Sequence, residues 1–490
     1  MKKLMITAAL LILCASLVSC SIVTVNKKQP EPADTSEPAS LPEGLTRVEV
    51  DTDSMKKQAV AMLNSLDTVN LNSSNGFTVA STDQKVYVPD SNNSNYNAAL
   101  IERNKMFEKK YSVEINQFYD STDAMLEEAY QDMLAGIYYT DVFSIPQRDL
   151  GRFISKGVLL KTSSLPDIDF SAAYFDSAAM EQASAGFDCY AVYGEFNRDI
   201  DSYYCLYVNR ELLARAGLSM PYDMVKNGTW TWDELIHMVR ASAQINTDAA
   251  AIASSAMAEL TAVCYKSSGA NFIDTGYQKT PSVAYGNENT ANVINLLRTL
   301  TQSGKSVYDA TSESSSAVTD FMQGKALFCI ATVGDMKKIT TMQNDWCVLP
   351  LPKTDAGAET YYTYAGASHA VIACYAGAKN TDAVSAALCG LNAASSGGYL
   401  TAAYYYELID TSIRDSSALD MMDYICGIKG GHAVNDFTDV YGDTHPALIS
   451  DTKEALVQTL LNYSLDAYSV AQASQKDLGW RMSAAFPMIW

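Results

Sequence analysis

Histidines and cationic residues are scarce in this sequence. Its 490 residues include 35 Lys and Arg against 56 Asp and Glu, which gives a formal net charge of −21. Because phosphate binding needs a positive field, this balance argues against nucleic acid as a partner. The four histidines and ten cysteines form no clustered ligand set and no C-x-x-C pair, so we expect no metal, haem or other cofactor.

The motifs of common enzyme classes are also missing. The chain contains neither H-E-x-x-H nor G-x-S-x-G, and Gly304-Lys305-Ser306 lacks the upstream glycine of a P-loop. Ser54 and Lys57 match an S-x-x-K spacing, but no K-T-G or S-D-N follows, so we interpret the match as chance. A surface-attached glycoside hydrolase that uses a pair of carboxylates needs no local motif and stays open as an alternative.

No apolar run long enough to span a membrane occurs after the first twenty residues. At the N-terminus, Lys2 and Lys3 precede an apolar stretch, 4–18, which leads into Leu-Val-Ser-Cys ending at Cys20. This order is typical of a signal peptide, 1–19, and its end resembles a bacterial lipobox, which implies lipidation of Cys20. The alternative is an ordinary signal peptide followed by an incidental cysteine.

A polar stretch with four prolines follows, and we interpret 20–46 as the lipidated cysteine and a flexible linker. The full sequence is 48 % hydrophobic and 19 % charged, which is typical of a folded protein. Its length predicts roughly two to four domains. We therefore expect an extracytoplasmic globular body that is anchored to the cell membrane by lipid.

Eight cysteines lie beyond residue 20, several of them in apolar runs such as 327–330 and 371–374. Buried free thiols are the interpretation we favour. Disulfides between Cys189 and Cys205 or between Cys374 and Cys389 stay open.

Strands alternate with helices in the first part of the globular region. Strand patterns at 76–80, 113–115 and 139–143 are separated by helical periodicity over 98–110 and 123–135. This β-α-β order predicts a parallel sheet covered by helices. Ligands of such sheets gather at the carboxyl ends of the strands.

A new unit begins near residue 200 with a strand at 203–208, and apolar strands recur at 326–330 and 346–349. After the first of these, Asn209 is a good helix N-cap and Gly217 a stop signal. Thr231 and Glu234 have the spacing of a capping box, with Trp230 and Leu235 at the staple positions. We therefore expect Trp230 and Trp232 to be structural residues.

Four passages of the sequence resemble the extracellular solute-binding proteins of carbohydrate ABC importers, the maltodextrin-binding-like family. They occur in the family's order and are GIYYTDV at 136–142 with KGVL at 156–159, CYAVY at 189–193 with LYVNRELL at 206–213, GTWTWDEL at 228–235, and VLPLPK at 348–353. The resemblance implies an α/β, two-lobed periplasmic-binding-protein-like fold of type II, in which discontinuous lobes are joined by a multi-strand hinge. It implies no catalysis: the protein would capture an oligosaccharide between the lobes and deliver it to permease subunits, as a monomer.

The same resemblance implies lobe boundaries and a set of ligand-binding residues. The N-terminal lobe would comprise 47–200 plus 365–410, and the C-terminal lobe 201–364 plus 411–490. The implied ligand-binding residues are Gln147 and Arg148 after the strand at 141–143, Glu195, Asp201 and Tyr203 at the first crossing, Asn271 and Phe272 in a glycine-rich loop, Asp335 after a buried strand, and Ser368 at the return crossing. Tyrosines cluster near the crossings at 203–204, 361–364 and 404–406. The alternative roles are a surface ion pair for Arg148 and half-buried sheet or helix edges for single tyrosines.

Overall fold

The computed structural model describes residues 52–69, 71, 76–83, 87–186, 188–246, 248–254, 257–277, 279, 282–284, 288–302, 307–309, 316–413, 416–427, 431–434, 466–469, 472 and 475–476. The signal peptide and linker that we predict, Cys20 included, lie outside these residues, as does most of the segment beyond residue 434. Among the described helices, none is long and apolar enough to cross a membrane.

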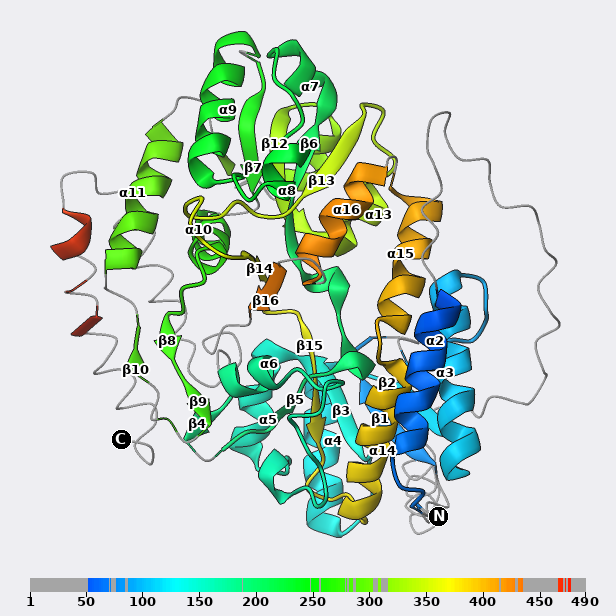
Figure 1. The fold of residues 1–490 in the computed structure, drawn as a ribbon. Helices are drawn as coiled ribbons and strands as arrows, with labels where there is room; N and C mark the ends of the chain where they lie inside the picture. Colours follow the sequence, from blue (N-terminus) through cyan, green and yellow to red (C-terminus); the bar gives the residue numbers. More distant parts are fainter. Residues whose placement is uncertain are drawn as a thin grey trace, which may run out of the picture. The chain divides into compact units, whose positions relative to one another are not determined.

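The first sheet has five strands in the order β2-β1-β3-β15-β5 (Figure 1). Their bounds are Phe77–Ser81 for β1, Ile115–Tyr119 for β2, Val142–Pro146 for β3, Ala191–Val192 for β5 and Ala370–Cys374 for β15. Strand β1 is parallel to β2 and β3, as the β-α-β order predicts, whereas β15 is antiparallel to β3 and β5. The parallel pairing predicted for the first three strands is confirmed, and the antiparallel strand β15 enters from a distant part of the chain that local periodicity does not connect to β3.

Four long helices belong to the same part of the molecule. They are α2 (Thr52–Ser65), α3 (Asn95–Tyr111), α4 (Thr122–Ala135) and α14 (Thr381–Ser395). Helices α3 and α4 begin at serine N-caps, where Ser94 accepts from the amide of Asn97 and Ser121 from that of Ala124. Helix α14 packs against both α2 and α3. The apolar core between α3, α14 and the sheet includes Phe107, Ile372 and Leu388.

The second sheet also has five strands, in the order β11-β7-β12-β6-β13. Their bounds are Tyr204–Asn209 for β6, Ala250–Ser254 for β7, Val307–Asp309 for β11, Ala326–Thr332 for β12 and Trp346–Leu349 for β13. Strand β7 is parallel to β11 and β12, and β6 is antiparallel to β12 and β13. The three strands predicted from the sequence near 203–208, 326–330 and 346–349 are therefore neighbours in one sheet.

The helix that follows the tryptophan pair begins where the sequence predicts. Helix α9 spans Trp232–Ile245, and the Thr231 side chain accepts a hydrogen bond from the Glu234 amide. Trp230 and Trp232 are fully buried, and their indole N–H groups donate to the carbonyl of Pro350 and the hydroxyl of Ser267. The structural role predicted for both tryptophans is thus confirmed.

Two predicted strands are displaced along the chain by two or three residues. Strands β2 and β3 begin at Ile115 and Val142, later than the sequence pattern suggests. Before β3, the Thr140 hydroxyl donates to the carbonyl of Thr78, and the Asp141 carboxylate accepts from the Thr78 amide at 2.9 Å. These side-chain hydrogen bonds keep Thr140 and Asp141 out of the hydrogen-bonded ladder between β1 and β3.

The remaining elements are further helices, 3₁₀ turns and short strands. The helices are α5 (Leu150–Lys156), α6 (Ser177–Gln182), α7 (Arg210–Arg215), α8 (Tyr222–Lys226), α10 (Met257–Ser267), α11 (Glu288–Gln302), α12 (Ala317–Met322), α13 (Met336–Ile339), α15 (Tyr399–Thr411) and α16 (Ser416–Ile425). The 3₁₀ turns are η1 (Gln147–Asp149), η2 (Thr162–Ser164), η3 (Glu195–Asn197), η4 (Ile200–Ser202) and η5 (Val333–Asp335). The short strands are β4 (Ala185–Gly186), β8 (Ile273–Asp274), β9 (Gly276–Tyr277), β10 (Ser282–Val283), β14 (Tyr361–Tyr364) and β16 (Gly431–Val434).

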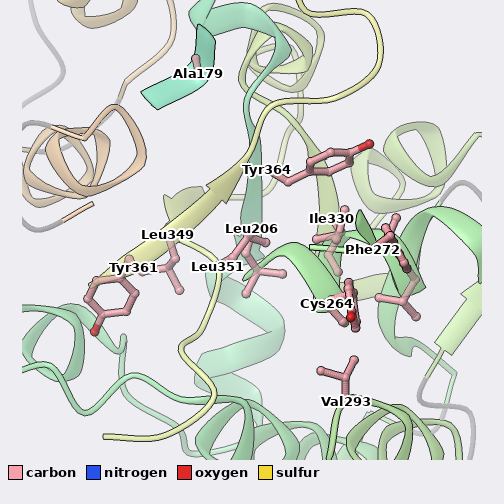
Figure 2. Close-up of a cluster of buried hydrophobic side chains, with 14 of the residues drawn as sticks. Ala179, Leu206, Cys264, Phe272, Val293, Ile330, Leu349, Leu351, Tyr361 and Tyr364 are labelled. Carbon is pink, nitrogen blue, oxygen red and sulfur yellow. The ribbon is translucent and has the colours of Figure 1, made fainter. Parts of the chain in front are cut away.

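The apolar core that lies against the second sheet also includes side chains from the helices that cover the sheet. Figure 2 shows Leu206, Ile330 and Leu349 of three sheet strands together with Cys264 of α10 and Val293 of α11. Burial of this apolar surface is the main source of stability for such a layer.

All eight described cysteines are buried and carry free thiols. This confirms the free-thiol interpretation, and neither Cys189–Cys205 nor Cys374–Cys389 is a disulfide. Burial raises the pKa of the thiol at Cys426 to about 11 and at Cys374 to about 12.

Candidate functional site

A cleft of about 500 Å³ lies at the carboxyl ends of β1 and β3. Its wall comes from the ends of these two strands, the first turns of α3, the segment through η3 and η4, helix α13, the return to β15, and helix α15. The lining residues are Thr82, Asp83, Tyr87, Tyr96, Asn97, Leu100, Ser144, Pro146, Glu195, Phe196, Asn197, Arg198, Asp199, Ile200, Asp201, Lys337, Ser368, Ala370, Leu400, Thr401, Tyr404 and Glu407. The position agrees with the rule that parallel strands present ligand sites at their carboxyl ends.

Aromatic rings form two pairs in this wall. Tyr87 and Phe196 lie with ring centroids 4.6 Å apart, and the Tyr87 hydroxyl bonds to that of Ser144 at 2.8 Å. Tyr96 and Tyr404 meet edge to face at 5.7 Å and 82°. The pairs bring α3, α15 and η3 together around one space and offer apolar surface beside polar groups.

Asp201 connects three segments of the chain at one edge of the cleft. Its carboxylate accepts from Lys337 of α13 at 2.8 Å and from the Tyr404 hydroxyl of α15. An alanine Cβ at Gly334 would lie 3.1 Å from the Asp201 Cβ, so η5 is also packed against it. Asp201 therefore holds the crossing segment, the end of β12 and helix α15 in one arrangement.

Glu195 lies at the other edge of the crossing segment. Burial raises the pKa of its carboxyl group, and the nearby Arg198, 3.6 Å away, offsets only part of this effect. Its Oε2 atom is buried and receives no hydrogen bond from any residue that the structure describes. Within the described ranges, no three His, Cys, Asp or Glu side chains are arranged to hold a metal ion.

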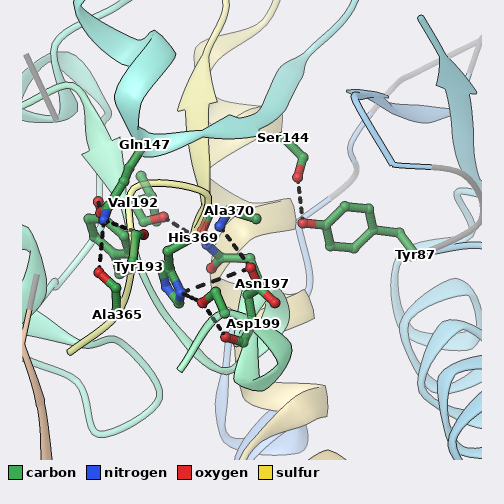
Figure 3. Close-up of polar contacts among 12 residues, drawn as sticks. Tyr87, Ser144, Gln147, Val192, Tyr193, Asn197, Asp199, Ala365, His369 and Ala370 are labelled. Atoms are coloured by element: carbon green, nitrogen blue, oxygen red, sulfur yellow. Dashed lines mark hydrogen bonds and ion pairs between the residues drawn. The ribbon is translucent and has the colours of Figure 1, made fainter. Parts of the chain in front are cut away.

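The return crossing is fixed beside the cleft by a buried hydrogen-bond network (Figure 3). The side-chain amide nitrogen of Gln147 donates to the carbonyls of Ala365 and Gly366, and the Oε1 atom of the same side chain accepts from the Tyr193 hydroxyl at 3.0 Å. Asp199 accepts from the amide of Ala370 at 3.1 Å. His369 is stacked between the rings of Tyr193 and Tyr203, and its Nδ1 lies 2.6 Å from the Ser202 hydroxyl.

We predict that His369 makes the protein less stable in mild acid. Burial lowers its pKa, although Asp199 and Asp176 oppose this effect. Below a pH of about 6.5, the usual histidine pKa, the unfolded chain therefore binds a proton that the native state excludes. Through this residue the free energy of unfolding should fall between about pH 7 and pH 5.5, by no more than about 1 kcal/mol, which is the limit for a native state that binds no proton.

Urea denaturation at several pH values checks this prediction. In His369→Gln the acid loss should shrink by that amount, whereas it should persist in His237→Gln, which replaces an exposed histidine of α9. An unchanged pH profile in His369→Gln would contradict the prediction.

Of the nine ligand-binding residues predicted from the sequence, Glu195, Asp201 and Ser368 line this cleft. Gln147 is fully buried behind it, in the network described above. Arg148 is exposed, and its amide donates to the carbonyl of Ala367. Tyr203 is buried; it stacks on His369, and its carbonyl accepts from the Val333 amide.

The other three predicted residues are engaged elsewhere. Phe272 is fully buried and stacks on Tyr265 at 4.3 Å, and Asn271 accepts from Lys266 at 2.6 Å. Asp335 caps η5 by accepting from the hydroxyl and amide of Thr332. None of the three lines the cleft, and with no ligand present their roles in binding stay predictions.

Several lining residues were not among those predicted from the sequence. They are chiefly Asp83, Tyr96, Arg198, Asp199, Lys337, Tyr404 and Glu407. The tyrosine cluster at 404–406 was a usable signal for Tyr404. Tyr96 and Glu407 carry no local signal, because which face of α3 or α15 meets the cleft depends on how the helices pack.

Comparison with known proteins identifies related sequences and folds. The model of a family described as bacterial extracellular solute-binding protein matches residues 102–388. No curated protein sequence matches the chain.

Three solved structures share the fold at low identity. The cyclic alpha-maltosyl-1,6-maltose binding protein of Arthrobacter globiformis is 15 % identical with a TM-score of 0.57, over 82 % of this chain and 98 % of its own. The GacH receptor of Streptomyces glaucescens GLA.O, solved unliganded and with acarbose, is 16 % identical with a TM-score of 0.52, over 82 % and 98 %. UgpB of Mycobacterium tuberculosis, solved with glycerophosphocholine, is 17 % identical with a TM-score of 0.53, over 84 % and 100 %. The chain therefore has the type II fold of periplasmic-binding-like proteins.

Proposed function

Because the chain belongs to the family of bacterial extracellular solute-binding proteins, we propose that it captures an oligosaccharide in the cleft and delivers it intact to an ABC-transporter permease. The observation that carries this proposal is the cleft of about 500 Å³, lined by both aromatic rings and carboxylates. Its volume lies in the range of small-molecule sites, roughly 300–1,000 Å³.

The chemistry of the lining suits a sugar. The C–H faces of a pyranose ring pack on aromatic faces, and Tyr96 and Tyr404 supply rings in the wall of the cleft. Sugar hydroxyls are donors, and charged acceptors such as Glu195 and Glu407 form hydrogen bonds worth roughly 1.5–3 kcal/mol each. Structural neighbours solved with or named for sugars support the same class of ligand.

We propose that the ligand acts by closing two lobes, 47–200 plus 365–410 and 201–364 plus 411–490. The distribution of strands supports this division, since the first sheet uses strands up to Val192 plus β15 and the second uses β6 to β13. A ligand shifts an open–closed balance only if it binds the two states with different affinity. Asp83 follows β1 of the first sheet and Lys337 follows β12 of the second, and both border the cleft, which suits such a ligand.

The location that the family indicates is extracytoplasmic. We propose that a lipid on Cys20 holds the protein at the membrane as a monomer, within reach of its permease. A multiply acylated cysteine provides stable anchoring, because each buried CH₂ contributes about 0.8 kcal/mol.

Thermal melting with a broad panel of oligosaccharides tests the proposal. At least one glycan should raise the melting temperature, because a ligand that binds only the native state stabilises it. Tyr96→Ala should weaken the affinity for that glycan about tenfold, the equivalent of one aromatic stacking contact. Tyr119→Ala is the matched control, since Tyr119 is 53 % exposed at the end of β2 and does not line the cleft.

Two results would overturn the proposal. One is the absence of any response across the glycan panel. The other is cleavage of a bound oligosaccharide, detected by chromatography of the products. Cleavage is the relevant alternative because the raised pKa of Glu195 would suit the general acid of a glycosidase carboxylate pair.

A further inference from the structure

Acidic side chains outnumber basic ones in the lining of the cleft. Among the described lining residues, the carboxyl groups are those of Asp83, Glu195, Asp199, Asp201 and Glu407, and the cations are Arg198 and Lys337. Both cations already lie against carboxylates, since Lys337 binds Asp201 at 2.8 Å and Arg198 lies 3.6 Å from Glu195. The described lining therefore keeps an excess of negative charge.

The charges of three of these carboxylates act on one tyrosine side chain of the lining, that of Tyr96. Burial raises the pKa of Tyr96 to about 12; Arg103 opposes this rise, and the negative charges of Asp201, Asp199 and Glu407 add to it. Burial lowers the pKa of Lys337, yet Asp201, Glu407 and Asp83 outweigh burial and raise it. The geometry agrees with this at one carboxylate: Asp201 accepts from the Tyr404 hydroxyl, and the Tyr96 ring meets the Tyr404 ring edge to face at 5.7 Å, so negative charge lies beside this pair of rings.

Two carboxylate oxygens in this region are buried without a donor. Oε2 of Glu195 and Oε2 of Glu407 receive no hydrogen bond from any residue in the described part of the chain. A buried carboxylate oxygen without a donor is costly, because nothing offsets its negative charge. A positive charge on a ligand in the cleft would offset part of this cost without contact with these two atoms.

On the basis of the function proposed above, we propose that the ligand is a glycan carrying a protonated amino group, held by Glu407 and Asp199 against the ring of Tyr96. A neutral hydroxyl satisfies the hydrogen-bonding capacity of a carboxylate but leaves its charge uncompensated. An ammonium group supplies both the donors and the opposite charge, and aromatic faces attract it. The amino group thus distinguishes this ligand from a neutral oligosaccharide of the same size.

Isothermal titration with two matched oligomer series tests the inference. Glucosamine oligomers with free amines are compared with N-acetylated oligomers of equal length, below the pKa of the amine. The aminated series should bind at least tenfold more tightly, and Glu407→Gln should reduce that preference about tenfold, the loss expected for one charge-assisted contact. Asp199→Asn should act in the same direction. Glu128→Gln, which replaces an exposed glutamate of α4, should leave both affinities unchanged.

The outcomes separate the two proposals. Equal or tighter binding of the N-acetylated series, or an amine preference that survives in both Glu407→Gln and Asp199→Asn, would overturn the inference and leave the sugar-binding function intact. If neutral and aminated glycans all fail to bind, both proposals are overturned. Thermal melting of each variant without ligand verifies that it is folded.

Discussion

Trp232→Ala is expected to lower the free energy of unfolding by about 3–5 kcal/mol, the usual cost of removing a large buried aromatic side chain. Trp232 is fully buried in the core of the second sheet, at the first position of α9. Its indole N–H donates to the Ser267 hydroxyl at 3.1 Å, so the substitution also removes a link between α9 and α10. Urea denaturation monitored by circular dichroism measures the loss.

Trp232→Phe separates the two effects. It keeps most of the apolar surface but lacks the N–H group, so it should cost clearly less than Trp232→Ala. A loss below about 1 kcal/mol for Trp232→Ala would mean that the site collapses without a cavity, contrary to the packing described above.

Gly194→Ala is expected to lower the free energy of unfolding by about 3 kcal/mol, at the upper end of overpacking costs. An alanine Cβ at this position would lie 2.8 Å from the carbonyl oxygen of Tyr174 and would collide with Oδ1 of Asn392. That oxygen accepts from the Phe196 amide, so relief of the collision displaces η3. Because η3 carries Glu195 and Phe196 into the cleft, the rise in melting temperature with ligand should also shrink.

Gly357→Ala is the matched control for this substitution. Gly357 is exposed, and the nearest atom to an added Cβ belongs to the flexible Asp355 side chain. It should change stability by less than about 0.5 kcal/mol. If Gly194→Ala behaves like Gly357→Ala, the close approach between η3 and α14 does not constrain the cleft.

Local signals predicted the helices and strands well where short-range bonds decide the structure. Asn209 caps α7, Thr231 caps α9, and Gly217 follows the end of α7 with a positive φ of 68°. The motifs in family order also predicted the type II fold, because a resemblance to a family implies the fold of that family as a whole. The antiparallel place of β15 is not visible locally, since its partners lie far away in the sequence.

The site was less predictable than the fold. Glu195 and Asp201 were predicted from the resemblance, which implies ligand contacts at the first crossing between the lobes, and both line the cleft. Phe272 looked like a ligand contact in the sequence, but it is covered because Tyr265 stacks on it. Tyr96 and Glu407 occupy helix faces whose direction is set by packing of α3 against α15, which no sequence spacing records.

Because the eight described cysteines are buried, their reaction with a thiol reagent would report local opening of the native state. A thiol reacts as the thiolate, and burial suppresses both the reagent's access and, for most of them, the ionisation. Modification by a thiol reagent should therefore proceed only through transient openings of the native state, so its rate at each sulfur would map which layers loosen first. In an oxidising periplasm or cell exterior, these buried thiols would therefore stay reduced for as long as the protein stays folded.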